Sequence, residues 1–141
     1  MDEFVIKSSV DDCTIAFVER EPEDPTLPIE RFRVKVTRND LSATAPVWGG
    51  YTLSSPAPWF HELARNWQDW QGELVWNSLE RELALVATRD RLGHINIRIE
   101  LRSGLMAHEW SLQAFVVVDA GQLDVLARQA ERFFGREVIC R

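Results

Sequence analysis

The stretch Ile95-Asn96-Ile97-Arg98-Ile99-Glu100-Leu101 alternates strictly between apolar and polar side chains. Successive side chains of a β-strand point to opposite faces, so this period of two predicts a strand with one face in the core and the other in solvent. The segment 108–118 places four apolar side chains on one face and carries Phe115 and Val117 on the other. This second pattern predicts a central strand or one that is covered on both faces.

Further strands are predicted around these two. The segments 4–6, 14–18, 31–38 and 83–88 are β-branched or alternating, and a strand from about Ala43 to Leu53, interrupted at Gly49-Gly50, follows the turn Asn39-Asp40. The turns between neighbouring segments are too short for the crossover of a dozen or more residues that parallel strands need. We therefore expect a mostly antiparallel, curved sheet of about seven or eight strands.

Two segments show the helical period of apolar residues. The first begins within residues 55–58, where proline in the first turn costs no hydrogen bond, and is expected to end at Gly72 with His61 on its solvent side. The second begins after Asp119, a good N-cap residue, and is expected to end at Gly135. The fold class is therefore α+β, with both helices packed on one face of the sheet.

Length and composition indicate one domain. A chain of 141 residues, 45% hydrophobic and 27% charged, forms a single domain over residues 1–141. No apolar run approaches the ~18 residues of a membrane helix, and the start Met1-Asp2-Glu3-Phe4 is acidic where a secretory signal is basic. Cys13 and Cys140 are expected to be free thiols, so the expected compartment is the cytoplasm and no membrane association is expected.

The formal net charge of −6 is concentrated near the start of the chain. Residues 1–30 carry nine acidic side chains against two basic ones. Nucleic acid is an unlikely partner on this basis, because phosphate contact needs a basic face. The charge fits a basic protein partner, and it equally fits an acidic loop that only keeps the protein soluble.

No catalytic, metal or cofactor site is predicted. His61, His94, His108 and the two cysteines have none of the paired spacings of metal ligands, and neither cysteine has the setting of a nucleophile. Glu80 and Glu82 lie two residues apart and could do acid–base work if a histidine converged on them. The alternative for these two glutamates is a polar hairpin.

The six tryptophans exceed the usual frequency, and four of them fit a core face by periodicity. Core packing is the leading interpretation of the tryptophans; the alternative is that at least one is an exposed anchor, and Trp48 and Trp76 are the candidates for that role. A polar face could also run continuously over two strands, either as a solvated surface or as a partner-binding one; its members are Arg33, Lys35, Asn96, Arg98, Glu100 and Arg102. The predicted partner-binding residues are Trp48, Trp76, Glu80, Glu82, Arg98 and Arg102.

The string Trp67-Gln68-Asp69-Trp70-Gln71-Gly72, followed by Trp76-Asn77-Ser78-Leu79-Glu80, resembles an uncharacterised bacterial family of unknown function. The resemblance runs from about Trp59 to Phe134 and implies a domain unit without an assigned activity. In layout alone the chain is also similar to WapI-like immunity proteins of bacterial toxin systems, which are small, often acidic α+β proteins that neutralise a toxin by binding it.

The leading functional hypothesis is a non-enzymatic protein-interaction module, with an immunity-like inhibitor that binds a basic toxin domain as its specific form. The alternative is a small-molecule or oligonucleotide-binding domain that uses a concave sheet face lined by aromatic and arginine side chains, with a tryptophan beside Arg98 or Arg102. Self-association into a homodimer is also expected to be possible, because apolar strands with an open edge favour sheet pairing.

Overall fold

Eight strands and two helices make up the part of the chain that the computed structural model describes, residues 3–24, 26–48, 55–104 and 109–135. In chain order the elements are β1 Phe4–Lys7, β2 Thr14–Glu21, β3 Arg31–Arg38, β4 Leu41–Trp48, α1 Ala57–Asn66, β5 Leu74–Asn77, β6 Leu83–Arg89, β7 His94–Arg102, β8 Ser111–Asp119, a 3-10 turn Ala120–Gln122 and α2 Leu123–Phe134. The fold is α+β, as predicted, and each half of it is a run of four strands followed by one helix.

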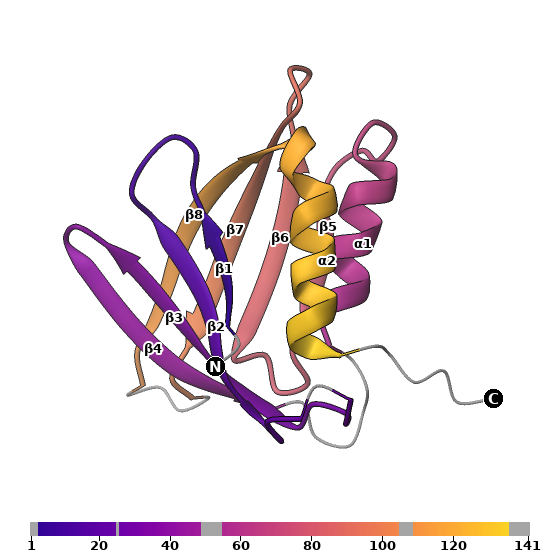
Figure 1. Ribbon diagram of the computed structural model, residues 1–141. Coiled ribbons are helices and arrows are strands. Elements are labelled where there is room, and N and C mark those ends of the chain that lie inside the picture. Colours follow the sequence, from indigo (N-terminus) through magenta and orange to yellow (C-terminus); the bar gives the residue numbers. More distant parts are fainter. Residues whose placement is uncertain (1–2, 25, 49–54, 105–108, 136–141) are drawn as a thin grey trace.

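The strands form two antiparallel four-stranded sheets rather than one sheet. The first has the order β1-β2-β3-β4 and the second the order β5-β6-β7-β8, so each is a simple meander (Figure 1). They meet at β1 and β8, where Ser9 N donates to Val117 O at 2.8 Å and Val117 N donates to Ser8 Oγ at 3.0 Å. Because β1 has only four residues, this junction is a local link and not a continuous ladder.

The alternation of the Ile95–Leu101 stretch is confirmed. These residues lie in β7, and the four apolar side chains of the stretch are buried, while Asn96 on the opposite face is exposed. The segment 31–38 forms β3 with its three predicted apolar side chains in the core. The predicted strand over residues 43–53 begins earlier, at Leu41, and residues 49–53 lie outside the described residues.

Helix α1 is shorter than predicted. It ends at Asn66 and not at Gly72. Asn66 O accepts from Trp70 N at the helical spacing of four residues, but it also accepts from Asp69 N at a spacing of three, which tightens the chain into a turn. Trp70 is still buried, as its periodicity suggested. The short strand β5 that follows has no alternation long enough for the sequence to predict it.

The boundaries of the last helical segment agree with the prediction. Asp119 precedes the 3-10 turn that leads into α2, and its N–H donates to Gln122 Oε1 at 2.9 Å. Gly135 follows α2 with φ of 85°, and its N–H donates to Glu131 O at 2.8 Å. Glycine is favourable at this position because it adopts a positive φ without a steric cost.

The two helices lie side by side against the same side of the strands (Figure 1). A cluster of phenylalanine rings joins them to the first sheet; its members are Phe4, Phe17, Phe32, Phe60, Phe133 and Phe134. The ring centroids of neighbours in this cluster lie 4.9–6.4 Å apart, mostly edge to face. Among the described residues, the only buried polar or charged ones are Arg20 and Ser78.

Two smaller findings concern the thiol and the helices. Cys13 is buried and is not part of a disulfide, while Cys140 lies outside the described residues. Neither described helix combines the length and the apolar character that crossing a membrane requires.

Candidate functional site

The outward face of the second sheet has an apolar centre. Val75, Val86, Arg98 and Phe115 follow one another across β5, β6, β7 and β8 in register, and we call them the Phe115 row. Val75 is 49% exposed and Phe115 44% exposed, while Val86 between them is only 4% exposed. The sequence predicted that β8 would be central or covered on both faces. It is the last strand of its sheet and meets only the end of β1, and Phe115 is exposed because both helices pack on the inward side.

Arg98 gives this row a fixed charge. Its Nε lies 2.9 Å from Glu100 Oε2, and its NH1 lies 3.7 Å from Glu73 Oε2. Exposed ion pairs of this kind contribute little to stability. Their effect here is to hold the guanidinium between two carboxylates, so the apolar row is bordered by charges of both signs.

A polar cavity lies beside the row on the same face. It has a volume of about 640 Å³, and its lining residues are Asn77, Arg81, Ala84, Glu100, Arg102, Ser111, Leu112 and Gln113. Ala84 lies between Asn77 of β5 and Glu100 of β7 in register. The short alanine side chain leaves a hollow between longer neighbours, which explains why the cavity forms there. We call it the Arg81–Arg102 cavity.

Glu82 has a structural role at the end of this sheet. Its Oε1 accepts from Ser78 Oγ at 2.8 Å, its Oε2 accepts from Trp48 N at 3.0 Å, and its carbonyl oxygen accepts from Arg102 N at 2.8 Å. The end of β4 is thereby attached to the turn between β5 and β6. The side chain of Trp48 remains 42% exposed at this corner.

The structure brings together three of the predicted partner-binding residues, Trp48, Glu82 and Arg102, while Glu80 is exposed on the adjoining turn. Arg98 lies on the same sheet face, four residues from Arg102 along β7. Trp76 does not belong to this surface. It pairs with Leu85 in register and packs against the core, and its Nε1 is buried without a partner in the described residues.

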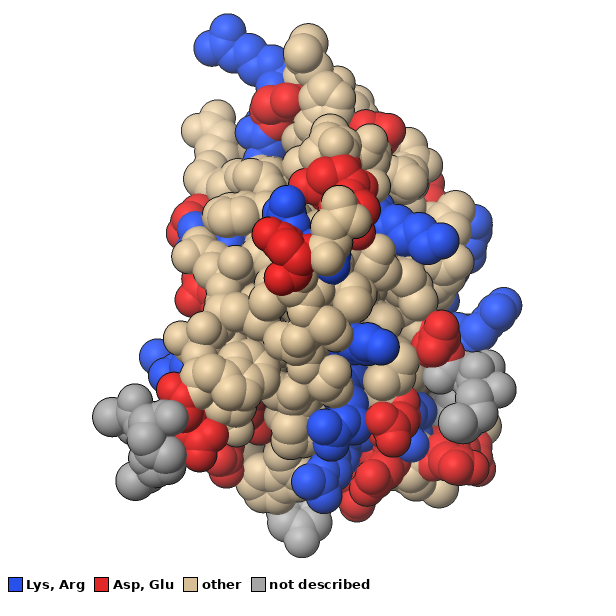
Figure 2. Space-filling view, turned by 90° about the vertical axis from the view of Figure 1, so that its left-hand side faces the viewer, with Lys and Arg blue, Asp and Glu red and all other residues tan. Residues whose placement is uncertain are grey.

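The continuous polar face expected over two strands is not formed. Arg33 and Lys35 lie on β3 of the first sheet, and the other members lie on β7 of the second. In strand order, β2, β1 and β8 lie between the two groups. Figure 2 shows acidic and basic side chains interspersed over the face that it draws, without an extended area of one sign.

The end of β2, next to the acidic loop, contains a residue whose role the sequence did not reveal. Arg20 is 6% exposed, and its guanidinium donates to Phe133 O at 2.7 Å, Phe134 O at 3.2 Å and Asp24 O at 2.9 Å, and also to two further carbonyls of the loop. Burial lowers the pKa of Arg20 from its ordinary value, and the charge of Asp24 acts in the opposite direction. We call this arrangement the Arg20 clasp; it attaches the loop to the last carbonyls of α2, where a cation is favourable.

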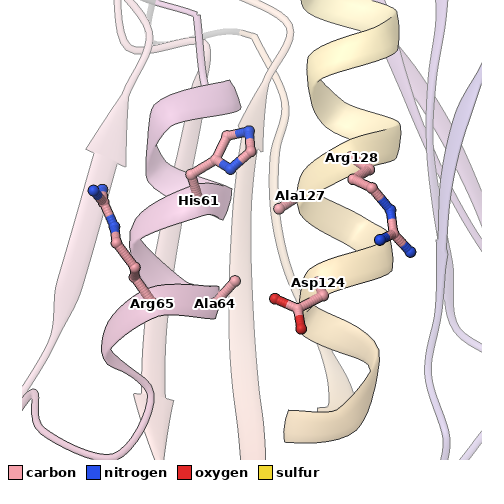
Figure 3. A pocket seen from close by; sticks show the side chains of 6 residues that line it. All are labelled: His61, Ala64, Arg65, Asp124, Ala127 and Arg128. Atoms are coloured by element: carbon pink, nitrogen blue, oxygen red, sulfur yellow. The ribbon is translucent and has the colours of Figure 1, made fainter.

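A groove between the two helices has a volume of about 530 Å³. Ala64 and Ala127 face each other across it, whereas Arg65 and Arg128 point away from each other on its outer sides (Figure 3). His61, expected on the solvent side of α1, lies half-buried at this groove, and its Nε2 is 3.0 Å from Glu131 Oε2. The prediction for His61 was wrong because α2 packs against that side of α1.

The titratable groups that could do chemistry are not gathered. His94 Nδ1 lies 2.8 Å from Asp90 Oδ2 in the turn between β6 and β7, and this hydrogen bond and the charge of Asp90 raise the pKa of His94. Burial, followed by the charge of Asp11, raises the pKa of the Cys13 thiol, which is the opposite of what activates a nucleophile. No three His, Cys, Asp or Glu side chains cluster as a metal site would need within the described parts of the chain.

Comparison with known proteins assigns the chain to a family without assigning an activity. A family model described as a family of unknown function (DUF6228) matches residues 6–137, which is most of the chain and more than the segment 59–134 over which the sequence resemblance ran. A search of curated proteins gave no significant match.

Proposed function

This chain belongs to the DUF6228 family, and we propose that it is a protein-interaction module that binds its partner through the Phe115 row of the second sheet. The observation that carries this proposal is the exposure of Val75 on β5 and Phe115 on β8, with the buried Val86 and then Arg98 between them in the row. Large apolar side chains that are exposed on one sheet face can mark an interaction site.

The surroundings of the row fit the anatomy of a protein interface. Interfaces have an apolar centre that is enriched in aromatic side chains and in arginine, with a polar rim. Phe115 and Arg98 are direct neighbours in register, and Glu73 and Glu100 border them. The strands themselves are held in a regular ladder, so the row is already in place before a partner binds, which lowers the entropic cost of binding.

The partner we propose is a basic protein, and its specific form is a toxin domain that an immunity-like inhibitor neutralises. The net charge of −6 favours encounter with a basic surface. The exposed carboxylates of Glu21, Glu23 and Asp24 add to this attraction, and the Arg20 clasp holds the backbone that carries them. A loop held in this way presents its charges in one arrangement.

The test is affinity capture from the native host with quantitative mass spectrometry, using the wild type and Phe115→Thr. Threonine keeps the β-propensity of the strand while it removes the aromatic ring. Since aromatic anchors dominate interface energies, we expect the captured protein to bind Phe115→Thr at least about tenfold more weakly. The matched control is Leu41→Thr, which changes an exposed apolar residue at the start of β4 in the first sheet and is expected to bind normally.

Equal recovery of the same proteins by the wild type and by Phe115→Thr would contradict the proposal. A captured partner with an acidic surface would contradict its electrostatic part. Sedimentation of the purified wild type and of Phe115→Thr checks the remaining occupant, a second copy of the chain. Dimerisation of the wild type that Phe115→Thr abolishes would show that the row is a homodimer interface and would overturn the proposal of a different protein.

A further inference from the structure

We propose that the Arg81–Arg102 cavity binds a small phosphate ester that carries hydroxyl groups, such as a sugar phosphate. This site is separate from the Phe115 row and does not depend on the function proposed above. The argument rests on the shape of the cavity, on its unpaired positive charge and on the backbone of Arg81.

Most of the cavity is built by the sheet, and the turn between β5 and β6 adds Arg81. Its floor is Ala84, and its walls include Asn77, Glu100 and Gln113, which follow one another across the strands in register with Ala84. The next position of β7 toward its end adds Arg102, opposite Ser111 of β8. A volume of about 640 Å³ lies in the range of small-molecule sites.

The positive charges of the two arginines that line the cavity are not paired with a carboxylate of the described residues. Arg102 Nε donates to the backbone carbonyl of Arg81 at 3.3 Å, and neither guanidinium forms an ion pair with any carboxylate of the described residues. Glu100 also lines the cavity, but its carboxylate is paired with Arg98 at 2.9 Å. The cavity therefore has positive charge available on a chain whose net charge is negative.

The backbone of Arg81 is in the left-handed region, with φ of 62°. This conformation is unfavourable for a residue with a Cβ, and glycine adopts it without that cost. The turn between β5 and β6 thus contains a strained arginine where glycine would be more stable. Residues in unfavourable backbone conformations cluster at functional sites. An arginine at this position, in place of the more stable glycine, indicates that its side chain has a role at the cavity.

The lining chemistry indicates the class of ligand. Arginine binds phosphate through two parallel N–H donors, so two arginines at one cavity suit a phosphate group. Asn77, Ser111 and Gln113 offer donors and acceptors for hydroxyl groups, and Glu100 offers further acceptors. None of the described lining residues is aromatic, so the cavity provides no surface on which a nucleotide base would stack.

The test is an NMR titration of the full chain with glucose 6-phosphate, with glucose and inorganic phosphate as controls. We expect saturable shifts of the amide signals of Arg81, Arg102 and Gln113 with the sugar phosphate, at an affinity of about millimolar or tighter. Glucose is expected to cause no shift, and inorganic phosphate is expected to bind more weakly than the ester. Absence of any shift with the ester, equal shifts with glucose, or inorganic phosphate binding as tightly as the ester would overturn the proposal.

Three variants separate a ligand role from a structural one. Arg81→Gly removes the guanidinium and the strain together, so it is expected to unfold at a higher urea concentration while it binds the ester at least about tenfold more weakly. Its matched control is Glu19→Gly, because Glu19 has a φ of 52° and lies in the first sheet, far from the cavity in sequence and in sheet order. Glu19→Gly is expected to gain stability and keep wild-type binding.

The third variant, Ala84→Leu, fills the floor of the cavity and leaves both arginines in place. It is expected to lose binding of the ester by a similar factor, because the hollow and not the charge alone is required. Wild-type affinity in either Arg81→Gly or Ala84→Leu would overturn the proposal. Phe115→Thr is expected to bind the ester normally, so failure of the protein-partner proposal leaves this test unaffected.

Discussion

The two meanders have the same order of elements but different outward faces. In the first sheet most outward side chains are small, hydroxylated or charged, such as Lys7, Thr14, Lys35, Thr37, Ser42 and Thr44, and the large apolar exceptions are Val5, Val18 and Trp48. In the second sheet the outward face carries the Phe115 row and the Arg81–Arg102 cavity. Because the core constrains only the inward side chains, the same topology allows the two outward faces to differ in this way.

The loops of the two meanders are also stabilised differently. The long loop between β2 and β3 depends on the Arg20 clasp, and so on the carbonyls of α2 more than a hundred residues away. The turns of the second meander use their own side chains: Asp90 Oδ1 accepts from Leu92 N and His94 N, and Ser78 Oγ accepts from Leu83 N. The β2–β3 loop of the first meander therefore depends on the completed fold, while the turn between β6 and β7 is a local structure; the turn between β5 and β6 combines a local bond with the one from Trp48 N to Glu82.

The largest effect is expected for Arg20→Met. Methionine fills much of the space but leaves five carbonyl oxygens without their donor, and unsatisfied buried acceptors are costly. We expect the free energy of unfolding in urea to fall by about 3 kcal/mol. Arg20→Lys keeps the charge without the planar fork, so it should restore part of the loss. A loss below about 1 kcal/mol in Arg20→Met would show that the clasp does not hold the first meander together.

Two tryptophans test how each half satisfies its buried polar atoms. Trp59 of α1 donates from Nε1 to Leu74 O at 3.2 Å, whereas the buried Nε1 of Trp76 in β5 has no partner in the described residues. Trp59→Phe should therefore lower the free energy of unfolding by about 2 kcal/mol, from a lost hydrogen bond and a smaller ring. Trp76→Phe also removes an unsatisfied donor, so its loss should stay below about 1 kcal/mol. Equal losses would argue against this difference.

The two strained residues allow the same change in each meander. Glu19→Gly and Arg81→Gly should each raise the free energy of unfolding by about 0.5–1 kcal/mol, because relief of the left-handed strain exceeds the entropic cost of glycine. Chemical denaturation of both variants measures this directly. If only one variant gains stability, the backbone is not equally strained at Glu19 and Arg81. Glu19→Gly would then no longer be a matched control for the ligand binding of Arg81→Gly.

The smallest effect concerns the turn between β6 and β7. The hydrogen bonds from the backbone and ring of His94 lower the pKa of Asp90, and Asp90 raises the pKa of His94. Because the pKa of His94 is raised, protonated His94 stabilises the folded protein. This stabilisation is fully present below the ordinary pKa of histidine and is lost as the pH rises through the raised pKa. The stabilisation by ionised Asp90 is lost as the pH falls through the lowered pKa of Asp90. The turn is therefore most stable at pH values between the pKa of Asp90 and the pKa of His94.

NMR titration of the His94 ring checks this relation. In Asp90→Asn the pKa of His94 should return toward its ordinary value, because the neutral amide removes the charge that favours the imidazolium. The same substitution should leave the signals of the first meander unchanged, since the turn is local. An unchanged His94 pKa in Asp90→Asn would contradict the assigned cause.

Prediction from the sequence succeeded where one residue and its close neighbours decide the structure. The alternation in β7, the cap at Asp119 and the termination at Gly135 follow from local geometry. It failed for the end of α1, where the hydrogen bond from Asp69 N to Asn66 O has a spacing of three residues and tightens the chain into a turn, and for His61, whose surroundings depend on α2. Of the candidate surface, Arg98 and Arg102 were found by alternation, whereas Phe115 was taken for a covered residue.

In the strands with clear alternation, such as β3 and β7, the sequence by itself determined which side chains face inward, because alternation and the hydrophobic effect act along a single segment. It also determined the antiparallel class, since the connections are too short for crossovers. Only the tertiary structure decided that the strands separate into two sheets, that Arg20 lies under the carbonyls of α2, and that one outward face stays uncovered. These features depend on which distant segments meet, and the pattern within a segment contains no information about its distant neighbours.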